Sequence, residues 1–306
     1  MQLLANFRLT SVSGKIAQLL PDPFTPIDQL IGTWTGTGFN QIWRPFHGTQ
    51  DRFLELNETL ETIQFDQIPG DIPNRGLLQG DMNLHGVRYL QQVQDAHVKE
   101  NGQPAGIHIE PGIWLTVPAT TNPLDPKTVS RLSNIPHGTS LVAQGSELPV
   151  LAGPPPIGPA SITPFLIAPP HTPVNFPEVN LGVATQFRTP HADIPNVTQA
   201  MVNNPNLVLQ QGLAGKTVTS TTTLRVSTKP LNPPATGGGT SNIAFLAGAA
   251  GGPNALSAEL DATFWIETFK LPNGTVKHQL QYSQTVLLNF NGLSWPHVSV
   301  ATLVKQ

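Results

Sequence analysis

Short stretches in which apolar and polar residues alternate recur towards both ends of the chain, separated by turn residues. From His297 to Val304 the alternation places the histidine on one strand face with small residues such as Ser299, while valines occupy the opposite face. Pro296 cannot donate a backbone hydrogen bond, so it is expected to be the first residue of this strand. A face of small residues indicates that something bulky lies against it, and His297 belongs to that face.

Similar patterns predict further strands on both sides of a different middle region. Glycines alternate with β-forming residues from Gly32 to Gly38, as expected where a strand bends or passes close to another backbone. Residues 54–65 alternate well enough for a second strand, although their glutamates leave a helix open. The other predicted strands are residues 86–93, 106–117, 140–144, 217–228, 262–271 and 275–290. The turns at 272–274 and 291–292 are expected to join the last three strands into a meander.

Two segments lack this alternation. Residues 146–216 form a proline-rich insertion, in which Asp193 as N-cap and helical spacing predict one or two short helices, interrupted at Pro205. Residues 231–258 form a glycine- and alanine-rich loop without the lysine of a phosphate-binding loop. Proline lowers the entropy cost of ordering a long loop, so we expect the insertion to pack as a flap over the barrel mouth or at a subunit contact.

The arrangement of these segments predicts the fold class. Strands at both ends of the chain, with inserts between them, favour a single all-β domain over residues 1–306. The simplest architecture is a closed antiparallel β-barrel with the insertion packed outside it or over its mouth. A β-sandwich is the alternative.

Composition excludes several classes of function. Only 11% of the 306 residues are charged and 31 are proline, yet 39% are hydrophobic, which indicates a folded chain with long ordered connections. A net charge of −3 gives no electrostatic footprint for nucleic acid or an anionic membrane. The absence of cysteine excludes disulfides and thiolate metal sites. We read neither a signal peptide nor an apolar run long enough for a bilayer, so a soluble cytoplasmic protein is expected.

Four motifs together suggest a family. They are Gly32 to Gly38 with Trp34, Ile107 to Trp114 with His108, Arg131 to Gly138, and His297 at the start of the last strand. On these motifs the chain resembles the nitrobindin family of heme-binding β-barrels, whose fold is like that of lipocalins and fatty-acid-binding proteins. The matched pieces exclude the insertion, and Asn40 stands where the family tends to have another glycine.

The resemblance implies a ferric heme b protein that binds nitric oxide or isomerises peroxynitrite. In that family the histidine matching His297 binds the heme iron, and the histidine matching His108 lies close to the heme. Trp34 and Trp114 would then line the barrel or pack in its core. A single protein ligand suffices for heme, because the porphyrin supplies the in-plane ligands.

Two other functions stay open on the sequence alone. The barrel could be a heme-free, lipocalin-like carrier of an apolar small molecule, with the insertion as its lid. It could also be an isomerase or cyclase that uses His108 or His297 as general acid or base. In each case the expected partner is a small molecule inside the barrel, and a homo-oligomer is left open.

Overall fold

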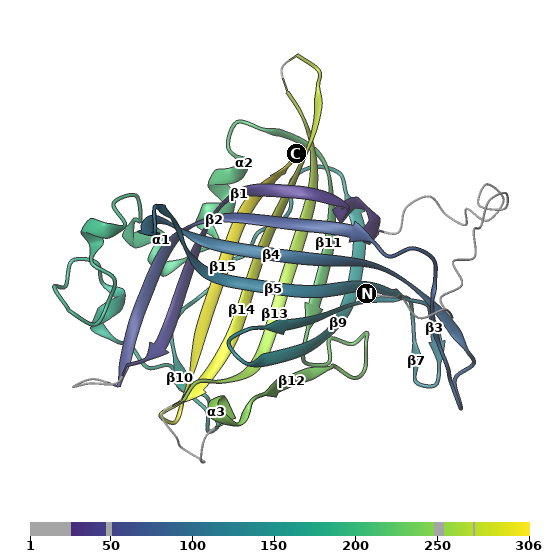
Figure 1. The fold of residues 1–306 in the computed structure, drawn as a ribbon, viewed down its shortest axis with the longest axis horizontal. Helices are drawn as coiled ribbons and strands as arrows, with labels where there is room; N and C mark the ends of the chain where they lie inside the picture. Colours follow the sequence, from purple (N-terminus) through teal and green to yellow (C-terminus); the bar gives the residue numbers. More distant parts are fainter. Residues whose placement is uncertain (1–25, 47–50, 248–253, 272) are drawn as a thin grey trace, which may run out of the picture.

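The computed structural model describes residues 26–46, 51–247, 254–271 and 273–306, and its main feature is a closed barrel of 10 antiparallel strands (Figure 1). In spatial order the barrel strands are β1 (Gly32–Pro45), β2 (Arg52–Gln67), β4 (Met82–Glu100), β5 (Gln103–Val117), β8 (Thr128–Ile135), β9 (Thr139–Leu151), β11 (Thr217–Ser227), β13 (Leu256–Lys270), β14 (Val276–Phe290) and β15 (Leu293–Lys305). Pairing of β15 with β1 closes the ring, which confirms the predicted barrel over the sandwich.

Smaller elements decorate the barrel. The short strands are β3 (Ile72–Asn74), β6 (Thr120–Thr121), β7 (Leu124–Asp125), β10 (Phe165–Leu166) and β12 (Gly239–Asn242). The helices are η2 (Pro26–Leu30), η3 (Pro177–Val179), η4 (His191–Asp193), α1 (Gln199–Asn203), α2 (Leu207–Leu213) and α3 (Ala244–Ala247). Within the described residues, no helix is long and apolar enough to cross a membrane.

Glycines permit the closure between the first and last strands. A Cβ atom at Gly36 would overlap the carbonyl oxygen of Thr302, and one at Gly38 would overlap that of Val300. The alternation of glycine in β1 therefore marks a close approach between backbones, as predicted. The meander of β13, β14 and β15 is likewise confirmed by continuous antiparallel pairing.

Pro296 is not the first residue of the last strand, contrary to the sequence-based expectation. Strand β15 begins at Leu293, and Pro296 pairs with Leu287 of β14 inside it. On the other side, β10 pairs only as far as Ser294, and β1 begins to pair at Val298. The proline lies between these two pairings, where its missing N–H costs no ladder hydrogen bond.

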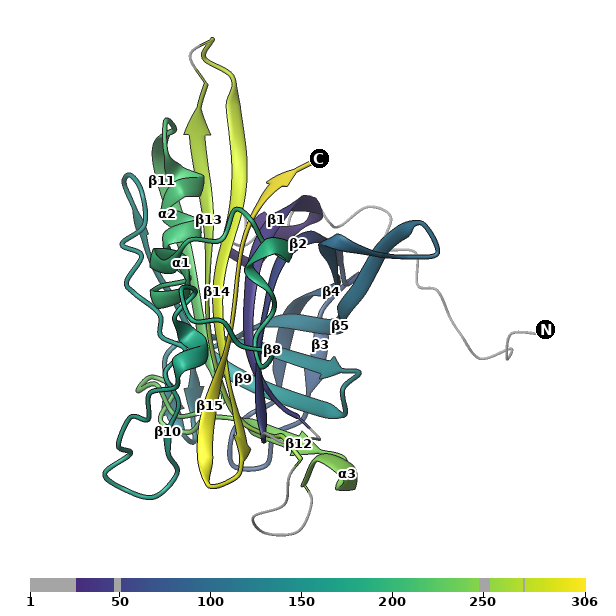
Figure 2. The same cartoon turned by 90° about the vertical axis from the view of Figure 1, so that its left-hand side faces the viewer.

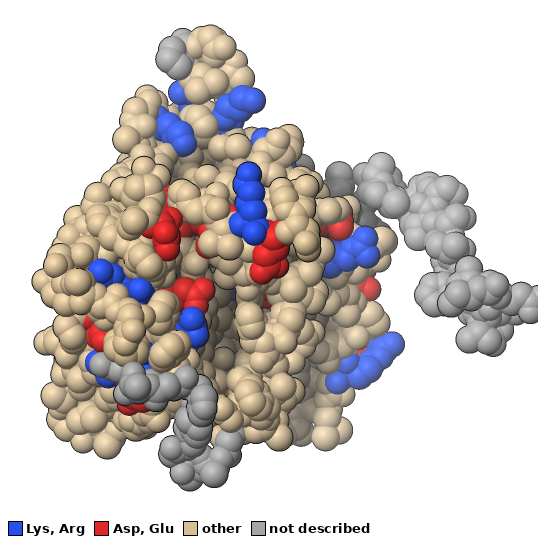
Figure 3. Space-filling model, turned by 60° about the vertical axis from the view of Figure 1, so that its left-hand side comes forward, with Lys and Arg blue, Asp and Glu red and all other residues tan. Residues whose placement is uncertain are grey.

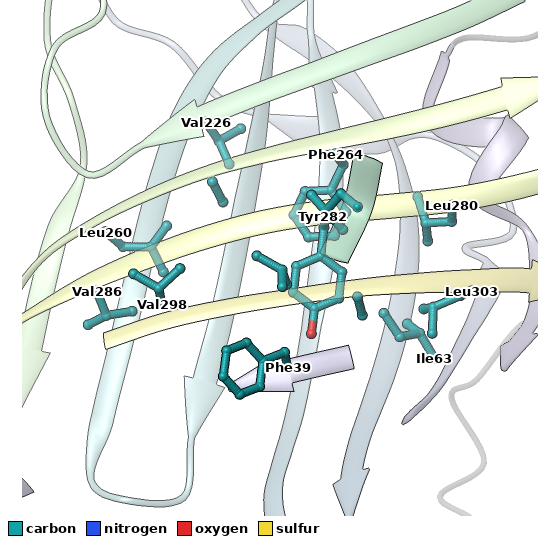
Figure 4. Packing of buried hydrophobic residues seen from close by; sticks show 14 of the residues in the cluster. Phe39, Ile63, Val226, Leu260, Phe264, Leu280, Tyr282, Val286, Val298 and Leu303 are labelled. Atoms are coloured by element: carbon teal, nitrogen blue, oxygen red, sulfur yellow. The ribbon is translucent and has the colours of Figure 1, made fainter. Parts of the chain in front are cut away.

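One end of the barrel interior is filled by apolar side chains. The short helix η2 closes this end with the fully buried Ile27 and Leu30, and the indole nitrogen of Trp34 donates to the Leu30 carbonyl oxygen at 2.6 Å. Deeper in the barrel, Phe264 and Tyr282 stack with ring centroids 5.3 Å apart (Figure 4). Burying each such side chain contributes about 1.5–3 kcal/mol, so this end is a packed core.

The insertion covers the outer wall of the barrel and not its mouth. Beyond Leu151, where β9 ends, the chain runs along the outside with α1 and α2 against the wall (Figure 2). Three wall side chains donate to insertion backbone carbonyls: Gln41 to Met201 at 2.9 Å, Trp43 to Ile162 at 2.9 Å and Gln281 to Leu209 at 2.8 Å. Of the two positions left open by the sequence, the structure shows the one outside the barrel, where the insertion covers the outward-facing Trp43 and its neighbours.

The two predicted helices of the insertion are present, but the first begins later than expected. Thr198, and not Asp193, is the N-cap of α1, since its hydroxyl accepts from the Met201 N–H at 3.3 Å. Asp193 instead ends η4. Pro205 separates α1 from α2, as the sequence indicated.

The glycine- and alanine-rich segment 231–258 carries more structure than a loop. Strand β12 pairs with β9, the single turn α3 follows, and β13 already begins at Leu256. Residues 248–253 lie outside the described part of the chain.

The face seen in Figure 3 carries few charges, with lysine and arginine interspersed among acidic residues.

Candidate ligand cavity

A cavity of about 330 Å³ lies in the end of the barrel opposite η2. Its apolar walls come from Ile42, Val93, Ile107, Ile135, Leu246, Val286 and Leu288. They belong to strands β1, β4, β5, β8 and β14 and to α3, so the cavity exists only once the ring is closed. None of residues 152–216 lines it.

Of the described residues, three histidines from distant parts of the sequence line this cavity: His297 in β15, His108 in β5 and His137 in the turn between β8 and β9. The rings of His108 and His137 lie with centroids 5.6 Å apart. Among the described residues, no group of three or more histidines or carboxylates is placed to hold a metal ion. The imidazoles therefore surround the space without converging on one point.

His297 is fixed by its strand neighbours. Its Nε2 lies 2.6 Å from the Asn40 side-chain oxygen and 3.3 Å from the Ser299 hydroxyl. Burial, followed by the nearby His108 and His137, lowers the pKa of His297 to about 3. The ring is therefore neutral at physiological pH, and because an amide oxygen only accepts, Nε2 donates to Asn40.

A buried ion pair lies beneath His108. The Arg131 guanidinium contacts Glu110 at 2.5 Å, Tyr89 at 2.9 Å and the Gln284 side-chain oxygen at 2.6 Å, and Tyr89 also donates to Glu110. His108 Nε2 is 3.4 Å from the same carboxylate. Burial alone would raise the pKa of Glu110, but Arg131 beside it lowers the pKa to about 2. Glu110 and Arg131 are thus both charged in the barrel interior.

A second buried carboxyl, Glu61 of β2, lines the cavity itself. Its Oε2 accepts from the Tyr282 hydroxyl at 2.6 Å and from Gln91 at 3.4 Å, and its Oε1 accepts from the Thr59 hydroxyl at 2.8 Å. Burial raises the pKa of Glu61, and these hydrogen bonds offset the rise only in part. Gly38 is needed here as well, since a Cβ would lie 2.6 Å from Glu61 Oε1.

The four site residues expected from the sequence divide into two groups. His297 and His108 line the cavity, whereas Trp34 and Trp114 lie in the packed end and do not. Trp114 makes an edge contact with Phe264 at 5.1 Å between ring centroids. The large rings fill the closed end of the barrel, which separates them from the histidines.

Sequence reasoning missed several cavity residues. His137 stands in the motif from Arg131 to Gly138 without an expected role at the site, yet its side chain lines the cavity from the turn between β8 and β9. Glu61 had a signal in the sequence, since the alternation of β2 places it on the same face as Ile63 and Phe65, both buried. A carboxyl on an apolar strand face indicates a buried and functional group.

The arrangement can enclose an apolar molecule and offer it imidazoles, amides and a carboxyl. In comparisons with known proteins, no family, no curated protein and no solved structure matches this chain. The closed antiparallel barrel is therefore the one feature of the nitrobindin resemblance that the structure shows.

Proposed function

We propose that this protein binds an apolar small molecule inside its barrel. The observation that carries the proposal is the cavity of about 330 Å³ with walls such as Ile42, Val93 and Leu288. Sites for small ligands typically have about 300–1,000 Å³, apolar walls and a few placed polar groups. Asn40, Glu61 and the histidines provide such groups.

A fluorescent probe tests this function directly. We expect N-phenyl-1-naphthylamine to bind with a saturable, one-to-one rise in fluorescence, because its rings would leave water for the apolar walls. Val286→Trp would fill part of the cavity and should weaken binding by about tenfold or more, which corresponds to about 1.4 kcal/mol. Val98→Trp, at an exposed position of β4, is the matched control and should bind the probe like wild type. Unsaturable binding, or equal binding by both variants, contradicts the proposal.

Heme b is a second candidate for the same cavity, favoured by a neutral imidazole in its wall. His297 would be the axial ligand, and heme would supply an iron centre for nitric oxide. One feature of the present geometry opposes ligation by His297, because Nε2 already donates to Asn40 at 2.6 Å. Iron binding at that nitrogen requires this hydrogen bond to be given up, and Asn40 stands where the family tends to have glycine.

Hemin titration separates these two candidates. A hydrogen bond of this kind contributes about 0.5–1.5 kcal/mol, so Asn40→Gly should bind hemin about two- to tenfold more tightly than wild type. His297→Ala should lose the sharpened Soret band, which is the readout. If hemin produces the same Soret change in His297→Ala as in wild type, iron ligation by His297 is wrong and the heme-free carrier stands.

A further inference from the structure

Among the described residues of the barrel interior, two buried carboxyls lie in different electrostatic surroundings. Glu110 is fully buried and has the guanidinium of Arg131 at 2.5 Å. Glu61 is 5% exposed, and in the described part of the chain no lysine or arginine lies within ion-pair distance of it. Its hydrogen-bond partners Tyr282, Gln91 and Thr59 are all uncharged, and His108 acts on Glu61 electrostatically but less than these hydrogen bonds do. Burying a carboxylate without a counter-charge is costly, so Glu61 lacks what Glu110 has.

The two carboxyls also differ in what they face. Glu61 lines the cavity, whereas Glu110 and Arg131 do not. A cation that reached Glu61 could therefore come from the molecule in the cavity. An opposite charge within about 4–6 Å favours the ionised carboxyl and would compensate for its burial.

We propose that the ligand of this cavity is an apolar amine whose protonated nitrogen pairs with Glu61. The inference rests on the proposed small-molecule binding and adds the chemical class of the ligand. The hydroxyl oxygen of Tyr282 would lie close to the nitrogen, because Tyr282 donates to Glu61 at 2.6 Å and lines the same space. The apolar body would lie against Val93 and Ile135.

The other charges around the cavity are consistent with this class. Arg44 and Glu55 at the rim form a pair at 2.7 Å and cancel each other. Burial lowers the pKa of both His297 and His137, so these rings are kept from opposing a cation. Among the described lining residues, Arg44 already pairs with Glu55 and His108 lies 3.4 Å from the Glu110 carboxylate, so an anionic ligand would meet Glu61 without a further basic group to pair with. An alcohol would leave Glu61 without a cation.

Three probes with the same naphthalene body test the inference: 2-(1-naphthyl)ethylamine, 2-(1-naphthyl)ethanol and 1-naphthylacetate. Their affinities are compared by calorimetry at about pH 8, where the amine remains protonated. We expect the amine to bind about tenfold or more tightly than the alcohol, and the carboxylate to bind most weakly.

Matched variants test whether Glu61 causes the preference for the amine. Glu61→Gln keeps the side-chain shape and removes the charge, so the amine should fall to the affinity of the alcohol. Glu58→Gln removes the same charge from the same strand, but Glu58 faces outward, where it contacts His97 at 2.7 Å. This control should keep the preference for the amine. The wild-type comparison of amine and alcohol stands without either variant.

The outcomes separate this inference from the function on which it rests. If the alcohol or carboxylate binds as tightly as the amine, or if the preference survives Glu61→Gln, the amine class is overturned and cavity binding stands. Binding of N-phenyl-1-naphthylamine without binding of any of the three probes also overturns the amine class alone. If no probe of either kind binds, both proposals fall.

Discussion

Replacing Arg131 with methionine is expected to lower the free energy of unfolding by about 3–5 kcal/mol, because Glu110 would remain buried without its cation. Arg131 is 1% exposed and contacts Glu110, Tyr89 and Gln284. Methionine fills similar space but offers no donor to any of them. Urea denaturation measures the loss. Arg88→Met is the matched control, since Arg88 lies at the surface, and it should change the free energy of unfolding by about 0.5 kcal/mol or less.

A double variant and a pH series identify the cause. Arg131→Met combined with Glu110→Gln removes both charges and should recover part of the loss. In wild type the pKa of Glu110 is lowered to about 2, so its contribution is present above its ordinary pKa and is lost as pH falls towards 2. The difference in the free energy of unfolding between wild type and Arg131→Met should therefore shrink as pH falls towards 2. A double variant less stable than the single one would contradict the ion-pair explanation.

Much of the barrel follows from local patterns along the chain. The glycines of β1 indicated a close backbone approach, and Gly36 and Gly38 make that approach to β15. The alternation from His297 placed this histidine on the face that turns out to point inward. Both inferences hold because a closed sheet exposes one face of every strand to a single interior.

The burial of the outer face of the same strands could not be predicted from the alternation of residues. Phe39, Gln41 and Trp43 alternate with the inward residues of β1, yet all three are buried, since the insertion covers them. Alternation predicts polar residues on an exposed face, and this face is not exposed. No pattern in residues 146–216 indicates the wall on which they lie, so the sequence left open whether the insertion packs outside the barrel or over its mouth.

The candidate site was predictable only in part for a similar reason. His297 and His108 had motifs around them, but Glu61, Gln91 and Tyr282 meet only after β2, β4 and β14 occupy the same ring. Hydrogen bonds over such sequence separations follow from strand register, which is set by closure of the whole barrel.

Barrel stability should fall as pH rises from about 5 to about 9, through one buried acid on the outer wall. Glu267 of β13 is fully buried; its Oε2 accepts from Gln279 at 2.8 Å, and its Oε1 has no partner among the described atoms. Burial raises the pKa of Glu267 to about 8, although Gln279 and Lys216 act in the opposite direction. An acid with a raised folded-state pKa contributes stability that is complete below its unfolded pKa and is lost as pH rises through the folded value.

Glu267→Gln should remove this dependence, because the amide stays neutral and keeps the shape of the side chain. At about pH 5 the variant and wild type should unfold alike, and at about pH 9 the variant should be more stable by a few kcal/mol, since each pKa unit corresponds to about 1.4 kcal/mol. Glu259→Gln, on the same strand but paired with Lys229 at the surface, is the control and should follow wild type. Thermal unfolding across this pH range is the measurement.

The loss of stability at high pH should begin where the insertion meets the barrel wall. Lys216, at the end of the insertion, donates to Gln279, and α2 lies over the neighbouring Gln281 through the Leu209 carbonyl. Ionising Glu267 under this cover favours water entry, which loosens the insertion before the ring of strands opens. Amide exchange of residues 207–216 should therefore become faster with pH in wild type, beyond the intrinsic rise in exchange rate, and not in Glu267→Gln. Equal amide protection of residues 207–216 in wild type and in Glu267→Gln at about pH 9 would contradict the prediction that ionised Glu267 loosens the insertion.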